Sequence, residues 1–136
     1  MKLRFHAVVV ACLLPMPAAS MEADRQVAVT VAADGKPQVF ADTIVEYETV
    51  AYVLLLQEGQ TLRAVLASSN AANHFDIYAP DSDKPLYVGA ESGNSHSVQA
   101  RTSGNYAIRV FLLRFAARDG QDARYELELT IYPVVH

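Results

Sequence analysis

Three arginines stand close together in the C-terminal third of the chain, among apolar residues. They are Arg109, Arg114 and Arg118, in the stretch TSGNYAIRVFLLRFAAR at 102–118. Arginine is always charged, and its planar guanidinium binds carboxylates through two parallel hydrogen bonds. Arg114 and Arg118 lie four residues apart, so one loop can present both to the carboxylates of another molecule. The residues alone favour the alternative, a set of surface ion pairs with acidic neighbours such as Asp119 or Asp122, which contribute little to stability.

Residues that resemble a nucleophile and its base are adjacent at Ser95 and His96. Neighbours on a strand point to opposite faces, so these two are poorly placed to share a hydrogen bond, even with Asp76 nearby. The chain also contains no G-x-S-x-G motif. The sequence therefore favours polar residues on an outer face over a hydrolytic site.

Paired carboxylates, which glycosidases require, occur at Glu46 and Glu48. A two-residue spacing on a strand turns both side chains to the same side, which is also the normal pattern of an exposed strand face. The exposed face is the interpretation that we favour.

Metal ligands are sparse. His74, His96 and His136 form no H-x-x-x-H motif, and Asp81 and Asp83 lack the spacing of a calcium loop and suit a turn. We expect no enzymatic activity, no metal and no cofactor.

The N-terminus has the pattern of a secretory signal peptide over residues 1–20. Lys2 and Arg4 precede a short apolar segment, and Ala18 and Ser20 stand at the small-residue positions of a cleavage site. A lipoprotein signal ending at Cys12 leaves too short an apolar segment before the cysteine. We predict export to the periplasm, with a single domain over residues 21–136.

Charge and cysteine content limit the partners of this domain. Removing residues 1–20 leaves 11 − 2 = 9 Lys and Arg against 15 Asp and Glu, a formal net charge of −6. An acidic domain lacks the basic face that nucleic-acid binding needs. Cys12, the sole cysteine, is removed with the signal, so the domain must rest on its hydrophobic core. No second apolar segment is long enough to span a membrane.

Short β-rich runs separated by turn residues fill the domain. They cover 27–32, 38–47, 50–57, 60–69, 74–79, 86–89, 95–100, 106–113 and 124–132. In the last run Tyr125, Leu127, Leu129 and Ile131 alternate with polar residues, as in a half-buried strand. The pattern predicts an all-β fold, an antiparallel β-sandwich of about eight strands.

The run 106–113 decides where the arginines lie. Tyr106, Ile108, Val110 and Leu112 share one face, and Arg109 lies on the other, where it can pair with a carboxylate. We expect residues 114–118 to form an irregular loop or one helical turn beyond this strand.

These motifs resemble the C-terminal half of the periplasmic inhibitors of goose-type (g-type) lysozyme. The shared pattern is Ser103-Gly104-x-Tyr106, then Arg109-Val110, then Arg114 and Ala117-Arg118, then the strand YELELTI. Upstream, Tyr47, Tyr52 and the Gly59-Gln60 turn occupy matching places. The strand and turn motifs also resemble the broader pre-peptidase C-terminal type of β-sandwich.

The resemblance implies a g-type lysozyme inhibitor that protects peptidoglycan and has no catalytic activity. It implies that Arg114 and Arg118 reach the active-site acids of the lysozyme and that Tyr47, on another strand, contacts it. Ser103 and Tyr106 belong to the same motif. The alternative function is a non-catalytic peptidoglycan- or carbohydrate-binding module of the pre-peptidase C-terminal type. Neither function involves nucleic acid or a membrane.

Overall fold

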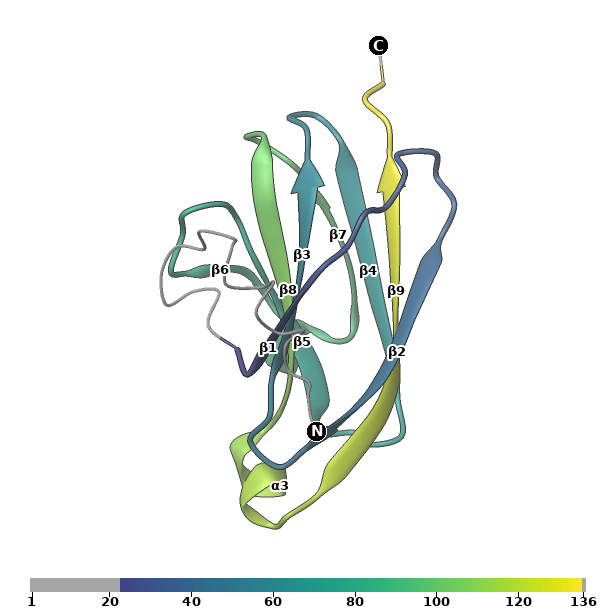
Figure 1. Ribbon diagram of the computed structural model, residues 1–136. Coiled ribbons are helices and arrows are strands. Elements are labelled where there is room, and N and C mark those ends of the chain that lie inside the picture. The colour runs from purple at the N-terminus through teal and green to yellow at the C-terminus, as the bar shows by residue number, and fades with distance from the viewer. Residues whose placement is uncertain (1–22, 136) are drawn as a thin grey trace, which may run out of the picture.

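Two β-sheets pack face to face in the structure, a computed structural model that describes residues 23–135 (Figure 1). The five-stranded sheet has the order β1 (Arg25–Ala28), β3 (Val50–Leu56), β8 (Gly104–Leu112), β5 (Asn73–Tyr78) and β6 (Pro85–Val88). The four-stranded sheet has the order β2 (Gln38–Val45), β9 (Asp122–Tyr132), β4 (Thr61–Ser68) and β7 (Ser95–Gln99). The described residues include two short helices, α2 (Gly89–Ser92) and α3 (Arg114–Arg118).

This arrangement confirms the predicted β-sandwich, with nine strands over residues 23–135 rather than about eight. Within the described part of the chain, every pair of neighbouring strands is antiparallel except β1 with β3, which is parallel. The predicted signal peptide lies outside the described residues, so its cleavage stays a prediction.

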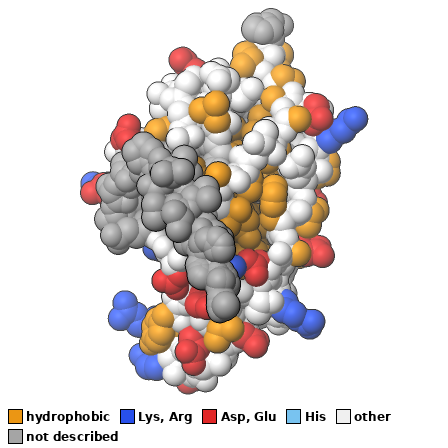
Figure 2. Space-filling model, viewed as in Figure 1, with side chains coloured by type: hydrophobic (Ala, Val, Ile, Leu, Met, Phe, Trp, Pro, Cys, Tyr) orange, Lys and Arg blue, Asp and Glu red, His pale blue; other side chains and the backbone are white. Residues whose placement is uncertain are grey.

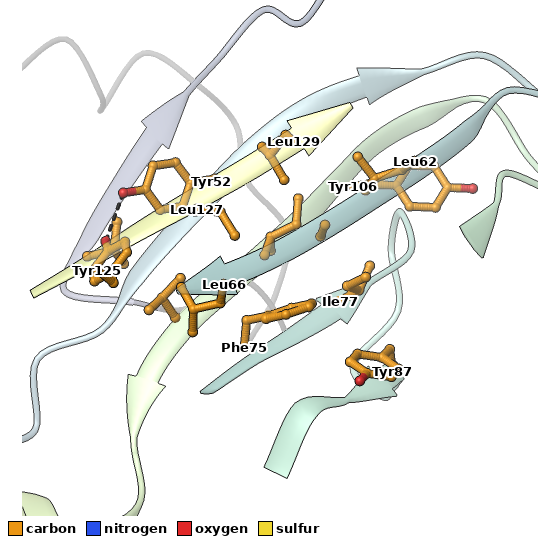
Figure 3. Close-up of a cluster of buried hydrophobic side chains, with 14 of the residues drawn as sticks. Tyr52, Leu62, Leu66, Phe75, Ile77, Tyr87, Tyr106, Tyr125, Leu127 and Leu129 are labelled. Carbon is orange, nitrogen blue, oxygen red and sulfur yellow. Dashed lines mark hydrogen bonds between the residues drawn. The ribbon is translucent and has the colours of Figure 1, made fainter. Parts of the chain in front are cut away.

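Alternating apolar residues from both sheets fill the space between the layers (Figure 3). β9 contributes Leu127 and Leu129, both fully buried, while Glu126 before them is exposed and Glu128 between them is half-buried. β5 contributes Phe75 and Ile77 from the opposite sheet. The two-residue period of each strand thus gives each sheet one apolar face, and burying these two faces together holds the layers in contact.

The predicted strand at 27–32 is displaced in the structure. β1 ends at Ala28, after which the Val29 amide donates one more hydrogen bond, to the Val53 carbonyl at 2.9 Å. The chain then crosses from the five-stranded sheet to β2 in the other sheet. Val31 is buried on this crossing although it has no strand partner. The apolar alternation therefore reports burial here and not strand pairing.

Two buried phenols tie the sheets together at the end that carries α3. The hydroxyls of Tyr52 on β3 and Tyr125 on β9 lie 2.8 Å apart and share a hydrogen bond (Figure 3). The Phe40 ring of β2 packs beside Tyr52, with 5.7 Å between the ring centroids. Burial raises the pKa of both phenols. Because neither hydroxyl can reach water easily, each depends on the other.

Replacing Tyr125 by phenylalanine should lower the free energy of unfolding by about 1–3 kcal/mol, since it leaves the Tyr52 hydroxyl buried without a partner. The double variant Tyr52→Phe/Tyr125→Phe should recover most of that loss, because no polar group is then left unpaired. Urea unfolding of the wild type, both single variants and the double variant measures the coupling. Equal losses in the single and double variants would contradict it.

The same pair sets an alkaline limit on stability. An unfolded tyrosine ionises near pH 10, and the raised pKa keeps both phenols protonated in the folded state. This contribution is complete below about pH 10 and is lost as the pH rises further. The double phenylalanine variant should therefore lose less stability than the wild type above pH 10 in the same unfolding experiment.

Candidate functional site

Arg109 is a structural residue on the outer face of the five-stranded sheet. Its guanidinium lies 3.7 Å from the Asp76 carboxylate on the neighbouring strand β5, and near the rings of Tyr78 and Phe111. Burial raises the pKa of Asp76, and the charge of Arg109 acts in the opposite direction. This confirms the expectation that Arg109 pairs with a carboxylate across the sheet.

Arg114 and Arg118 begin and end α3, the single helical turn that follows β8. The amides of Ala116 and Ala117 both donate to the Leu113 carbonyl at 3.0 Å, which closes the turn. Both alanine side chains are buried and anchor the helix to the sandwich. Gly120 ends it with a φ of +75°, a conformation that glycine adopts without strain. The expectation of one helical turn at this place is confirmed.

Both arginines of α3 are exposed and unpaired. Among residues 23–135, no carboxylate lies within ion-pair distance of either, and the nearby Asp119 and Asp122 do not pair with them. Residues four apart on a helix lie on the same face, so the two guanidinium groups project together. The alternative of ordinary surface ion pairs is wrong for these two residues.

Tyr47 lies beside α3, in the turn that joins β2 to β3. Its side chain is 62% exposed, and it lines a groove of about 360 Å³ together with Arg114 and Phe111. The predicted strand 38–47 ends earlier, at Val45, because Glu46 adopts a positive φ of 55° and reverses the chain. Tyr47 and Glu48 are therefore turn residues and not strand residues.

Hydrogen bonds from three loops brace this end of the molecule. The Glu46 amide donates to the Gln121 carbonyl at 2.9 Å, which joins the β2–β3 turn to the segment after α3. Asn70, between β4 and β5, donates through its side-chain amide to the Gln121 side-chain oxygen at 2.9 Å. The Leu113 amide donates to the Ala72 carbonyl at 2.9 Å. We call residues 46–49 and 113–121 the α3 tip.

Ser103 and Tyr106 lie at the opposite end of the sandwich. The Ser103 hydroxyl accepts a hydrogen bond from the Glu58 amide at 2.8 Å, which links the β7–β8 turn to the β3–β4 turn. Tyr106 is 1% exposed, and its hydroxyl donates to the Thr102 carbonyl. The length of β8, about 30 Å at 3.4 Å per residue, separates Ser103 from the α3 tip, and Tyr106 lies about 24 Å from it along the strand. Ser103 and Tyr106 therefore contribute to the packing of turns. The structure does not bring either of them close to Arg114 or Arg118.

The sequence reasoning overlooked one arginine near the tip. Arg124, at the start of β9, is exposed and has no ion-pair partner among the described residues. It lines a shallow groove of about 590 Å³ on the outer face of the four-stranded sheet, whose floor is formed by small residues such as Ala41 and Ala67. The alternation of the run 124–132 already placed Arg124 on the outer face, next to the arginine-bearing segment.

The other candidate chemistries find no assembled site. His96 stacks on the Tyr87 ring at 4.0 Å, while Ser95 is exposed on the other face of β7. Within the described residues, no group of three or more His, Cys, Asp or Glu side chains is placed to hold a metal ion. The described helices include none that is long and apolar enough to cross a membrane.

No protein-family model matches this sequence, and the comparison with curated proteins gives no match. Solved structures, in contrast, match over almost their whole length. Aeromonas hydrophila PliG, a periplasmic lysozyme inhibitor of g-type lysozyme, is 23% identical with a TM-score of 0.69, over 79% of this chain and 96% of its own.

The chain has the PliG fold. A mutant of the Escherichia coli inhibitor PliG-Ec is similar at 21% identity and a TM-score of 0.58, and Salmonella Typhimurium PliG at 17% and 0.60. Each match covers 79% of this chain and 97% of the inhibitor. The resemblance read from the sequence motifs is thus confirmed as a likeness of fold to three PliG structures, all described as inhibitors and not as enzymes.

Proposed function

We propose that this protein is a periplasmic inhibitor of a g-type lysozyme and that it acts by inserting the α3 tip into the active-site cleft. The observation that carries the proposal is the fold, since nearly the whole length of three periplasmic g-type lysozyme inhibitors matches this chain. The unpaired arginines of α3 supply the chemistry. The predicted signal peptide provides the route to the compartment in which those inhibitors act.

The spacing of Arg114 and Arg118 suits a pair of catalytic carboxylates. Four residues of helix correspond to a rise of about 6 Å. The two acids of glycoside-cleaving enzymes lie roughly 5–9.5 Å apart. One guanidinium for each carboxylate satisfies both charges of the cleft and blocks the position of the scissile bond.

Bracing of the α3 tip favours tight binding. The helix is anchored by two buried alanines and held by hydrogen bonds from the β2–β3 turn and the β4–β5 loop. A surface that is already ordered loses less conformational entropy when it binds. The net charge of −6 predicted for residues 21–136 also steers the protein toward a basic enzyme.

Tyr47 belongs to this surface because it lines one groove with Arg114. Ser103 and Tyr106 lie about the length of β8 away, so their contact with a lysozyme stays a prediction that requires a second contact region. We base the proposed interface on Tyr47, Arg114 and Arg118.

A lysis assay tests the proposal. Purified residues 21–136 are mixed with g-type, chicken-type and invertebrate-type lysozymes, and the clearing of a bacterial cell-wall suspension is followed. Selective inhibition of the g-type enzyme at sub-micromolar protein is the expected result. Absence of inhibition, together with sedimentation of the protein with purified peptidoglycan, would instead support the alternative of a peptidoglycan-binding module.

A further inference from the structure

The outward face of α3 carries an aromatic residue as well as the two arginines. Successive residues of a helix point about 100° apart. The buried side chains of Ala116 and Ala117 define the inward direction. Arg114, Phe115 and Arg118 therefore share the outward direction, with Phe115 beside Arg118. The Phe115 side chain is 54% exposed.

The fold does not require an aromatic ring at this position. Ala116 and Ala117 anchor the helix, and the Leu113 carbonyl closes its turn. A large apolar side chain left more than half exposed beside two unpaired charges adds little to the core of the domain. Figure 2 shows basic side chains standing out at the lower end of the molecule, where Figure 1 places α3, with exposed hydrophobic side chains beside them.

Arginine and aromatic residues together are the typical composition of the energetic centre of a protein interface. An apolar contact next to an ion pair also excludes water, and the lower local dielectric strengthens the attraction between the charges. Phe115, which lies on the same outward face beside Arg118, can both supply the apolar contact and exclude water from the ion pairs.

We infer that Phe115 is the apolar anchor of the interface and selects among lysozymes. This inference rests on the proposed function and adds a requirement for the partner. The cleft that accepts the α3 tip must offer a hydrophobic recess directly beside its catalytic carboxylates, so a lysozyme with a polar or filled surface there escapes inhibition even though its acids are the same.

The test compares Phe115→Gln, Phe115→Leu and a matched control, Leu86→Gln. Leu86 on β6 is also half exposed, at 51%, and belongs to neither segment of the α3 tip. Phe115→Gln should raise the inhibition constant for the g-type enzyme about 10-fold or more, because burial of the remaining apolar surface is lost. Phe115→Leu should lose less, and Leu86→Gln should inhibit like the wild type. All three should keep the wild-type thermal midpoint.

Calorimetry and salt dependence distinguish the anchor from the arginines. Phe115→Gln should make the heat-capacity change of binding less negative, since that quantity reports buried apolar surface. Its affinity should keep the wild-type dependence on salt, whereas Arg118→Ala should weaken that dependence, because salt screens charges and not apolar contacts.

Two outcomes overturn different parts of the proposal. If Phe115→Gln inhibits like the wild type while Arg118→Ala does not, the anchor is refuted and the inhibitor stands. If the wild-type protein inhibits no g-type lysozyme, the proposed function is refuted and the anchor with it.

Discussion

Replacing Arg118 by alanine should weaken inhibition of the g-type lysozyme by about 2–5 kcal/mol, the usual cost of removing one member of a buried interfacial ion pair. This corresponds to a rise of roughly 30-fold to several thousand-fold in the inhibition constant. In the proposed complex, most of the loss should come from the lysozyme carboxylate, which would be left buried without a counter-charge. Titration of the inhibitor in a lysis assay measures it directly.

The same substitution should leave the stability of the fold unchanged. Arg118 is exposed and has no ion-pair partner in the described part of the chain, so its removal breaks no internal contact and the thermal midpoint should stay almost constant. Arg118→Lys should inhibit at an intermediate level, since it keeps the charge but loses the bidentate fork. A variant that unfolds would instead place Arg118 in the structure of the domain.

A charge control is available at the other end of the sandwich. Arg101 is exposed and lies between β7 and β8, close to the turn that holds Ser103. Arg101→Ala changes the net charge by the same amount as Arg118→Ala and should leave inhibition intact. Equal losses in both variants would show that overall charge, and not the α3 tip, governs binding.

Replacing Gly89 by alanine should lower the free energy of unfolding by about 3 kcal/mol. Unlike Arg118→Ala, it should reduce stability and not inhibition. A Cβ atom at Gly89 would lie 2.3 Å from the Phe75 carbonyl oxygen and 3.1 Å from its amide nitrogen. Both are backbone atoms of a buried strand, so no side-chain rotation relieves the clash. The strand or the α2 turn has to move, at the cost of core packing around Phe75.

Urea unfolding and the lysis assay together check this second prediction. Gly89 belongs to the β6–α2 segment, outside the α3 tip, so the folded fraction of the variant should inhibit normally below its lowered thermal midpoint. Ala90→Ser, at the adjacent exposed position, is the matched control and should be neutral. Wild-type stability in Gly89→Ala would mean that the backbone around Phe75 has more room than the structure gives it.

The strands could be read from the sequence because their two-residue period is visible in each run. Leu127, Leu129 and Ile131 are buried as their alternation predicted. The end of β2 could not be read, because its reversal depends on a positive φ at Glu46, a residue type that rarely signals a turn. The run QVFADTIVEY therefore looks like one continuous strand, and Tyr47 was placed on it.

The site was partly predictable for a similar reason. The spacing of Arg114 and Arg118 indicated a shared direction, but a single helical turn is too short to show a period, so the position of Phe115 on the same face emerged only in three dimensions. The partner of Arg109 could not be predicted from the sequence either. Asp76 meets it through the register of β5 with β8, and strand register joins residues that are distant in the sequence.

The place of β9 in its sheet has a consequence for how the protein folds. β9 is the last strand among the described residues, yet it lies between β2 and β4, which are not paired with each other. A chain that emerges amino-terminus first, from a ribosome or through a translocation channel, cannot close this sheet until residues 122–132 have emerged. Assembly from such sequence-distant pairs is slow. The segment after α3, which pairs with the Glu46 turn, should therefore become ordered only after residues 122–132 have emerged.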